Sequence, residues 1–538
     1  MSFRGRRWVA PQPVPVDGVE SVPLPRWLRG LVKRRGWAED GELDRYLEPS
    51  LGHLDDPALL AGMSSACDAL VDAVQNGRTI TVYGDYDVDG VCATSVLVEF
   101  LRSVDATVDF YIPDRRSEGY GLNVDAIREI AGRSDLMVTV DCGITAVEAL
   151  SEARTLGLDV IVVDHHQVPA SLPPALACLN PHRPDCAYPF KPLCAAGLAF
   201  LLAVGLRRAL RDAGHFGDGE QPDVRPLLDI VALATVADMV PITGTNRVLV
   251  AAGLRRMKRN PRPGIRALMD VAGVDPREIR ARDLGYRIGP RINAKGRLAH
   301  AGDAVDLMLT PDATRARHLA ATLDQANGER REVEKRVQDE AIAQVEALKL
   351  ADGPAIVVEH PSWHPGVLGL VASRLVSRFH RPAVVIGEGG KGSGRSIEGL
   401  DLHAAISACR EHLDRFGGHP AAAGLTLRPG ALPAFRDAFE AAVVEHLGPP
   451  PYVAVVEPDL EVNDEELSLR MVQELSLLEP FGQENPEPLL MARRMRVREK
   501  RVVGGEHLKL SLGESGHDAI GFGLGAHADQ VPDEVDVV

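Results

Sequence analysis

The segment that decides the fold reads TITVYGDYDVDG at residues 79–90, where an apolar run passes directly into three aspartates. Thr79–Tyr83 is rich in β-branched and aromatic residues, so it predicts a β-strand. Residues Val91–Arg102, after the acids, have the character of a helix. A strand, an acidic turn and a helix in that order predict the first unit of a parallel α/β sheet, with the aspartates at the carboxyl end of the strand.

Three more β-type segments follow, at 107–112, 136–140 and 160–163. The second ends directly before Asp141, and the third ends directly before the run Asp164-His165-His166. In an open parallel sheet the carboxyl ends of the strands line the ligand crevice, so side chains that are distant in sequence converge there. We therefore predict that these acids and imidazoles gather at one edge of the sheet.

A group of carboxylates at one edge repels itself strongly unless cations lie among the acids. Oxygen ligands together with one or two imidazoles suit Mg²⁺ or Mn²⁺ better than zinc. The arrangement therefore predicts a metal centre. Its candidate residues are Asp85, Asp87, Asp89, Asp141, Asp164, His165, His166 and Asp238.

Each part of this set also has a simpler interpretation. The first aspartate run matches the opening of an EF-hand loop, but Val96 occupies the twelfth position, where calcium binding requires a glutamate. Asp141 alone is equally well explained as a helix N-cap. The two adjacent histidines alone would more often be structural, and Asp238 is a weak candidate by itself. The joint occurrence of acids and imidazoles at strand ends favours the metal centre.

The composition is that of an ordinary globular protein, with 538 residues of which 45% are hydrophobic and 25% charged. Such a length predicts roughly three to four domains. The net charge of −16 argues against a non-specific coat for nucleic acids, which is normally basic. A channel with locally concentrated positive charge stays compatible with that balance.

The cysteines and the N-terminus bear on location. Seven cysteines, an odd number without a CxxC pair, favour neither a disulfide framework nor a structural zinc site, so they indicate a reducing cytosol. Arg6-Arg7 is not followed by the apolar region of a signal peptide. No stretch has the length and apolarity of a transmembrane helix. We expect a cytoplasmic protein with no membrane partner.

Shifts in composition divide the chain into five parts. Residues 311–350 lack an internal proline and are rich in Glu, Arg, Gln and Ala, which predicts one long solvated helix. Pro449-Pro-Pro451 is typical of a linker. We predict an N-terminal leader that packs on the core at 1–60, an α/β domain at 61–309, a connecting helix at 310–350, a smaller α/β domain at 351–448 and a small β domain at 452–538.

Several motifs, taken together, resemble one family. Asp164-His165-His166 at a strand end, with the aspartate run upstream, resembles the DHH phosphoesterase superfamily. Further motifs resemble its RecJ branch, the single-strand-specific 5′→3′ DNA exonucleases, and the resemblance extends from about Thr79 to the C-terminus. These motifs are Ile112-Pro-Asp-Arg115, Glu118-Gly-Tyr-Gly-Leu122, Gly289-Pro-Arg-Ile-Asn-Ala-Lys-Gly-Arg297, Trp363-His-Pro-Gly-Val-Leu-Gly369, Gly392-Ser-Gly-Arg-Ser396 and Gly417-Gly-His419.

The resemblance implies a fold and an activity. The fold is a parallel-sheet DHH domain joined by the long helix to a second, smaller α/β domain of the DHHA1 type, followed by a β domain that resembles an OB fold. The activity is hydrolysis of single-stranded DNA from the 5′ end to nucleoside 5′-monophosphates, with two Mn²⁺ or Mg²⁺ ions as cofactors. Family members usually continue beyond Val538, so we expect a terminal β domain that is truncated or differently closed.

The resemblance also implies roles for individual residues. His166 faces the scissile phosphate as the catalytic histidine, and Asp164 orients the imidazoles. Which of the three acids of the first motif binds which ion stays open. The implied metal ligands are Asp85, Asp87, Asp89, Asp141, His165 and Asp238.

DNA contacts are expected from basic residues and glycine-rich backbone. Tyr286–His300 contains basic residues and no acid, and its glycines let backbone N–H groups approach an anion. A solvated basic face is the alternative there, and it is at least as probable for the basic stretch Arg247–Met269. The expected DNA-binding or phosphate-binding residues are Arg115, Arg291, Asn293, Arg297, Arg395, Ser396 and His419.

Other functions are compatible with parts of this pattern. A DHH phosphodiesterase of short oligonucleotides or cyclic dinucleotides would share the metal centre, but such enzymes lack the terminal β domain. A non-catalytic replication scaffold would have lost metal ligands, and a structural metal protein would need no DNA-facing motifs. By resemblance we expect single-stranded DNA as the substrate, a single-strand-binding protein and a helicase as partners, and a role in DNA repair and recombination.

Overall fold

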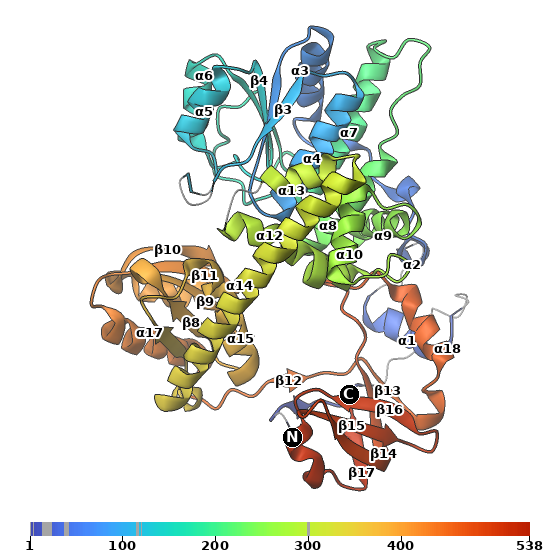
Figure 1. Cartoon of the computed structure of the whole chain (residues 1–538), viewed down its shortest axis with the longest axis vertical. Helices are drawn as coiled ribbons and strands as arrows, with labels where there is room; N and C mark the ends of the chain where they lie inside the picture. The colour runs from blue at the N-terminus through green and yellow to red at the C-terminus, as the bar shows by residue number, and fades with distance from the viewer. Residues whose placement is uncertain are drawn as a thin grey trace. The chain divides into compact units, whose positions relative to one another are not determined.

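The computed structural model describes residues 2–3, 5–12, 24–36, 42–114, 118–119, 121–298 and 302–538, without the side chains of residues 42 and 295–298. The chain forms two compact units (Figure 1). We call Val14–Asn327 together with Leu469–Glu487 the N-terminal unit. The C-terminal unit consists of Met1–Pro13, Gly328–Ser468 and Pro488–Val538.

A parallel sheet of five strands organises the N-terminal unit, in the order β3-β2-β4-β5-β6. The inner strands β2 and β4 are buried along their whole length, as expected for a parallel sheet covered on both faces. The four predicted strands are confirmed, and the short fifth strand was not predicted. The strands are β2 (Ile80–Gly84), β3 (Val108–Tyr111), β4 (Leu136–Val140), β5 (Asp159–Val163) and β6 (Ala177–Leu179).

Helices cover both faces of this sheet. On one face lie α5 (Val124–Ala131) and α6 (Val147–Thr155), and on the other lie α3 (Met63–Gln75), α4 (Val88–Ser103) and α7 (Ala195–Asp212) (Figure 1). Helix α4 follows the aspartate run, and within it only Glu99, Arg102 and Ser103 are not buried. The predicted helix after the acids is therefore a central element of the core.

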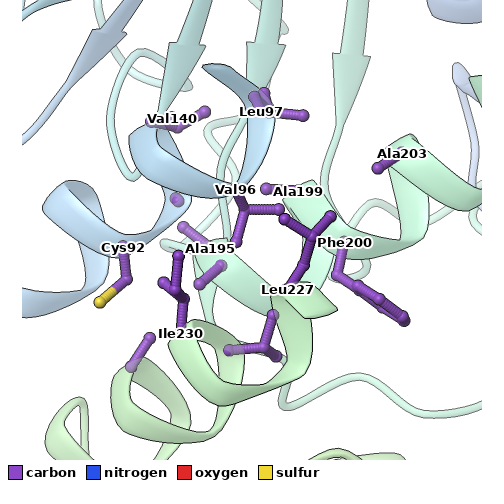
Figure 2. Close-up of a cluster of buried hydrophobic side chains, with 14 of the residues drawn as sticks. Cys92, Val96, Leu97, Val140, Ala195, Ala199, Phe200, Ala203, Leu227 and Ile230 are labelled. Carbon is purple, nitrogen blue, oxygen red and sulfur yellow. The ribbon is translucent and has the colours of Figure 1, made fainter. Parts of the chain in front are cut away.

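The core between α4, α7 and α8 (Leu228–Ala237) is built from small and large apolar side chains (Figure 2). Ala195, Ala199 and Ala203 repeat every four residues along α7, so their small side chains lie on one face of that helix. Val96 of α4 and Phe200 of α7 fill the space around them, and each buried side chain of this size contributes about 1.5–3 kcal/mol. This packing holds α4, which begins within the aspartate run, beside α7.

From Gly244 to Leu309 the N-terminal unit is mainly helical. It contains α9 (Gly244–Arg259), α10 (Pro263–Ala272), the short helix α11 (Ala281–Asp283), a π-helical turn at Leu284–Ile288, α12 (Gly289–Leu298) and α13 (Gly302–Leu309). The long helix predicted at 311–350 is confirmed as α14 (Ala313–Ala347). The backbone N–H of Thr314 donates to Asp312 Oδ1 just before its start.

A buried arginine joins the N-terminal helices to a distant segment of the same unit. Arg247 in α9 is 2% exposed, and its guanidinium carbon lies 3.7 Å from the ring centroid of Tyr46. Its guanidinium donates to Tyr46 O at 2.8 Å, Leu478 O at 3.1 Å and Glu479 O at 2.8 Å. Arg247 therefore does not belong to the solvated basic face considered for residues 247–269. It connects α2 (Glu42–Leu47) with the segment that contains α18 (Leu469–Leu475).

The C-terminal unit contains a second α/β sheet with the strand order β10-β11-β9-β8-β7. This confirms the predicted second α/β region. Its strands are β7 (Ile356–Glu359), β8 (Ala383–Ile386), β9 (Lys391–Arg395), β10 (Leu413–His419) and β11 (Ala422–Leu427), and its helices are α15 (Pro365–Phe379), α16 (Leu402–Ala408) and α17 (Leu432–Leu447).

A five-stranded β-sheet completes the C-terminal unit, with the order β13-β14-β15-β16 and with β17 paired to β14. The predicted β domain at the end of the chain is confirmed. Its strands are β13 (Leu460–Val462), β14 (Leu490–Val503), β15 (His507–Leu512), β16 (His517–Gly521) and β17 (Glu534–Val537). A separate parallel pair joins β1 (Arg7–Trp8) to β12 (Val455–Val456).

Among the described residues, no individual helix combines the length and apolarity needed to cross a bilayer. The adjoining segments Leu51–Leu59 and Met63–Gln75 meet these criteria only as a pair bent by 86°.

Candidate metal centre

The first aspartate run forms a tight turn between β2 and α4. Asp87 is the N-cap of α4, and its Oδ1 accepts hydrogen bonds from the N–H groups of Asp89 at 2.9 Å and Gly90 at 3.1 Å. A Cβ added at Gly90 would lie 2.4 Å from Asp85 O, so only glycine lets the turn fold back on itself here. The other carboxylate oxygen of Asp87 stays available for a ligand. The N-cap role considered for Asp141 is not observed, because the N-cap of the following helix α6 is Ala146.

Asp89 is 1% exposed and connects α4 with the start of α7. Its Oδ2 accepts a hydrogen bond from Ala195 N at 2.6 Å, and its Oδ1 accepts one from Ala196 N at 2.8 Å. These N–H groups belong to the first turn of α7, where the helix dipole favours a negative charge. Helix α7 therefore fixes the position of the third acid in the run.

Asp141 directly follows β4 and has a backbone φ of 63°, a left-handed conformation that is rare outside glycine but tolerated by aspartate. Its backbone N–H donates to Val163 O at 3.0 Å, which ties it to the end of β5. The Oδ1 of Asp141 lies 3.2 Å from His165 Nε2. The unusual backbone conformation thus accompanies a carboxylate held beside the histidines.

Asp164 organises the turn after β5. Its Oδ1 accepts hydrogen bonds from His166 N at 3.0 Å and His166 Nδ1 at 2.7 Å, and its Oδ2 accepts one from Ile144 N at 3.0 Å. Burial by itself would raise the pKa of Asp164, but these hydrogen bonds bring it below its ordinary value. The hydrogen bond to Asp164 in turn raises the pKa of His166. Asp164 therefore acts by positioning His166, and it belongs to none of the possible metal-ligand groups that the described residues form.

The predicted ligands form clusters of the right size for a cation. The donor atoms within each of three groups lie within 4.8 Å of one another. The groups are Asp85, Asp87 and Asp141; Asp89, His165 and Asp238; and Asp141, His165 and His166. Asp238 is the C-cap of α8, so it reaches the sheet edge from a helix rather than from a strand. The structure brings all six predicted metal ligands together.

The electrostatics of these groups fit a divalent cation. Burial, together with the charges of Asp89 and Asp87, raises the pKa of Asp238 to about 9. Burial also raises the pKa of Asp141 well above its ordinary value, with neighbouring carboxylates adding to the effect. Asp238 Oδ2 is buried and accepts no hydrogen bond from any residue that the structure describes. Oxygen-rich donors with one or two imidazoles are the set expected for Mg²⁺ or Mn²⁺.

Two of the predicted DNA-binding residues of the N-terminal unit, Arg291 and Asn293, make contacts within the unit. Arg291 Nη2 forms an ion pair with Asp324 Oδ1 at 2.9 Å. Asn293 Oδ1 accepts a hydrogen bond from Val88 N at 3.2 Å, so this asparagine braces the first aspartate turn. Arg115 and the side chain of Arg297 lie outside the described residues.

The predicted DNA-binding residues of the C-terminal unit gather at one end of its sheet. The strand register places Arg395 of β9, Ala422 of β11 and His419 of β10 in one row. Arg395 Nη1 donates to Ser393 Oγ at 3.1 Å and Gly394 O at 2.8 Å, and Ser396 Oγ donates to Leu400 O at 2.7 Å. Arg395 and His419 therefore lie in the same cross-strand row, with Ala422 of β11 between them.

One residue of the site was not predicted. Asn180, which is fully buried after β6, donates from Nδ2 to His166 O at 2.9 Å and accepts from His182 N at 2.8 Å through Oδ1. It connects the turn that carries the histidines to the next loop. The sequence signal was weak, because β6 has only three residues and an asparagine before a proline is typical of any turn.

Comparison with known proteins explains this arrangement. The DHH family N-terminal domain matches residues 79–235, the DHHA1 domain matches 352–445, and the RecJ OB domain matches 458–538. The single-stranded-DNA-specific exonuclease RecJ of Dickeya dadantii is 39% identical over 522 residues, which cover 94% of this chain and 90% of that protein. This chain belongs to the RecJ family.

Other RecJ proteins are similar to the same extent. The Escherichia coli protein is 38% identical over 536 residues, covering 96% of this chain and 91% of that one. The Bacillus subtilis protein is 39% identical, but this chain spans only 64% of its length. A crystal structure of RecJ from Thermus thermophilus in complex with Mn²⁺ superposes with a TM-score of 0.85 and 32% identity, covering 100% of this chain and 76% of that one. The resemblance to the RecJ family and the expected fold are both confirmed.

Proposed function

We propose that this chain is a metal-dependent exonuclease specific for single-stranded DNA, which hydrolyses phosphodiesters from the 5′ end and releases nucleoside 5′-monophosphates. The observation that carries the proposal is the convergence of all six predicted metal ligands at one sheet edge, in a chain of the RecJ family. The RecJ relatives carry the name of single-stranded-DNA-specific exonucleases.

Mn²⁺ or Mg²⁺ is the proposed cofactor, and two ions are proposed. The groups Asp85, Asp87 and Asp141, and Asp89, His165 and Asp238, share no residue, which supports two separate positions. Crystal structures of the T. thermophilus relative are described as complexes with Mn²⁺ and with Mg²⁺. When bound, such a pair supplies a water of lowered pKa and positive charge for the attacking and leaving oxygens of an in-line displacement.

The chain's own residues position the reacting phosphate. His166 Nδ1 donates to Asp164, so Nε2 is the ring atom that remains to interact with the phosphate. There it stabilises the charge on a phosphoryl oxygen or protonates the leaving alkoxide. Asp164 and Asn180 hold the backbone of His166 from two sides, which limits the freedom of the ring.

The roles of the other parts are proposals as well. We assign the metal chemistry to residues 61–309, DNA or 5′-phosphate contacts to 351–448 and a further grip on the strand to 452–538, with 310–350 as the connecting helix and 1–60 as a leader. Arg115, Arg291, Asn293, Arg297, Arg395, Ser396 and His419 are the proposed DNA contacts. The row that holds Arg395 and His419 supports the assignment for the second α/β domain.

The cellular setting follows from the same resemblance. We propose a cytoplasmic enzyme of DNA repair and recombination that works with a single-strand-binding protein and a helicase. The seven cysteines, all buried and unpaired, support a reducing compartment.

One experiment tests substrate, polarity and cofactor together. Single-stranded oligonucleotides labelled at the 5′ or the 3′ end are incubated with Mn²⁺, Mg²⁺ or chelator. The proposal expects immediate release of a labelled mononucleotide from the 5′-labelled strand and progressive shortening of the 3′-labelled strand, both only with metal. Preferential hydrolysis of dinucleotides over long strands would instead favour a phosphodiesterase of short substrates.

A further inference from the structure

A cavity of about 670 Å³ adjoins the metal centre. His165 forms part of its wall, and the rest comes from the loop after β5 and the loop after β6. The first loop contributes residues 167–170 and Leu172, and the second contributes residues 182–185. Its volume lies within the range of about 300–1,000 Å³ that small-molecule sites usually have.

Hydrogen bonds within the protein hold the two loops together. Asn180 bridges them by its hydrogen bonds to His166 O and His182 N. Asp164 N donates to Leu179 O at 3.0 Å, which joins the start of the first loop to the end of β6. The position of His182 is therefore coupled to that of His166, the residue proposed to face the scissile phosphate.

The charges in the cavity argue against a second phosphate. Arg183 is the cation in its wall, and its Nε and Nη2 donate to the two carboxylate oxygens of Asp185 at 2.9 and 2.6 Å. The pair is bidentate, so the guanidinium charge is already compensated by an acid that also lines the cavity. An anion entering there would meet Asp185 as well as Arg183.

The remaining wall suits a flat, partly apolar group with polar edges. Leu172 lines the cavity although 40% of its surface is exposed, and proline and valine side chains lie beside it. Gln167 and His182 offer groups that can hydrogen-bond to a base edge. Apolar or aromatic contact on one face and a few hydrogen bonds at the edge is how proteins hold unpaired bases.

We propose that this cavity binds the nucleobase of a nucleotide that flanks the scissile phosphate. Leu172 and His182 contact the base, while the adjoining metal centre holds its phosphate. The inference rests on the proposed exonuclease function and adds a base subsite to it. The base of the bound strand and the base of the released mononucleotide have the same chemistry, and either would fit the cavity. Two experiments distinguish them.

The first test measures binding without hydrolysis. The affinity of the full-length protein for deoxyadenosine monophosphate is compared with that for deoxyribose 5-phosphate, by calorimetry with Mn²⁺ present. The wild type is expected to bind the nucleotide at least about fivefold more tightly, as one base contact normally provides. Leu172→Ala and His182→Ala should bring the two affinities close together. Leu176→Ala is the matched control, because Leu176 is 45% exposed in the same segment but does not line the cavity.

The second test places the base in the strand. Oligonucleotides with an abasic site at the first, second or sixth position from the 5′ end are digested, and kcat/KM is compared with that of the intact strand. The inference expects kcat/KM to fall by about fivefold or more when the abasic site is at the first or second position, and not when it is at the sixth. This effect of the abasic site should be smaller in Leu172→Ala and the same as in the wild type in Leu176→Ala. Normal hydrolysis of all the abasic strands would show that the strand's base does not occupy the cavity.

The outcomes separate the inference from the function on which it rests. If the intact strand is not hydrolysed in a metal-dependent way, the proposed function fails. The binding comparison still shows whether the cavity binds a nucleobase. Hydrolysis combined with equal affinities for nucleotide and sugar phosphate, and with no abasic effect, overturns the inference alone. Preference for the nucleotide in the binding test, without an abasic effect in the strand, assigns the cavity to the released product.

Discussion

Asp164 Oδ1 lies 2.7 Å from His166 Nδ1, a short hydrogen bond between an acidic and an imidazole side chain of the turn after β5. The same oxygen also accepts the backbone N–H of His166. Since Asp164 is fully buried and Asn180 holds the carbonyl of His166, the ring is oriented from within the fold. The orientation of the proposed phosphate-facing histidine thus depends on a carboxylate outside the ligand clusters.

Replacing that carboxylate by its amide should slow the reaction without removing the metal ligands. Asp164→Asn keeps the shape of the side chain but weakens the hydrogen bond to His166 Nδ1, so kcat is expected to fall roughly 10–100-fold. The amount of Mn²⁺ bound should stay near that of the wild type. Turnover of single-stranded DNA and bound Mn²⁺ are measured on the same preparation. An unchanged kcat would contradict the positioning role of Asp164.

The metal-free stability should depend on pH through Asp238. Because the folded-state pKa of Asp238 is raised to about 9 from an ordinary value of 3.8, the folded state binds a proton that the unfolded state has released. This contribution to stability is fully present below about pH 4 and is lost as the pH rises toward 9. Asp238→Asn should flatten that part of the profile, measured as the thermal midpoint in chelator. A wild-type profile that rises with pH and does not respond to Asp238→Asn would contradict the assignment.

Gly90 should be essential to the shape of the first aspartate turn. Gly90→Ala puts a methyl group 2.4 Å from the carbonyl oxygen of Asp85, so the backbone that carries three acids must move. We expect the free energy of unfolding to fall by about 1–3 kcal/mol. The rate of hydrolysis should fall by more than this loss of stability explains. Denaturant unfolding and nuclease activity are the measurements.

Gly328 provides the matched control for that substitution. It also lies in a helix, α14, and nothing lies within 4 Å of a Cβ added there. Gly328→Ala should therefore stabilise the protein by about 0.5–1 kcal/mol and leave hydrolysis unchanged. Equal effects of the two substitutions would show that the close approach at Gly90 is unimportant.

Arg247 should stabilise the fold without taking part in the chemistry. Arg247→Ala removes the donors to Tyr46 O and Glu479 O and one of the donors to Leu478 O, which also accepts from Tyr46 and Asn485. The loss of these buried hydrogen bonds should cost about 3 kcal/mol or more. Arg255→Ala on the same helix removes one exposed hydrogen bond to Pro49 O and should cost less than about 1 kcal/mol. Unfolding in denaturant compares the two. Similar losses for both variants would contradict the role of Arg247.

The sheet and the residues at its edge could be predicted because the signals are local. Apolar runs that stop at Asp141 and at Asp164 mark strand ends, and the rule for parallel sheets brings such ends together. The clustering of those residues in the structure follows from that rule. Asp238 was a weak candidate by itself, because it lies at the end of a helix and carries no strand-end signal.

The rest depends on tertiary contacts that no local pattern reveals. The N–H groups that hold Asp89 come from Ala195 and Ala196, more than a hundred residues away in the chain. Arg247 could not be distinguished from a solvated arginine, because its acceptors are backbone carbonyls of remote segments. Asn293 was expected at DNA, and its contact with Val88 N depends on how α12 packs beside α4.

The most direct test of the account is the number of Mn²⁺ ions that the protein binds, measured by calorimetry on the wild type and on Asp141→Asn. Asp141 belongs to two of the three ligand groups, and asparagine tolerates its left-handed backbone, so the variant should fold. We predict two ions per chain in the wild type, with fewer or weaker ions and no hydrolysis of single-stranded DNA in the variant. One ion or none in the wild type, or normal hydrolysis by Asp141→Asn, would contradict a two-ion centre at this sheet edge.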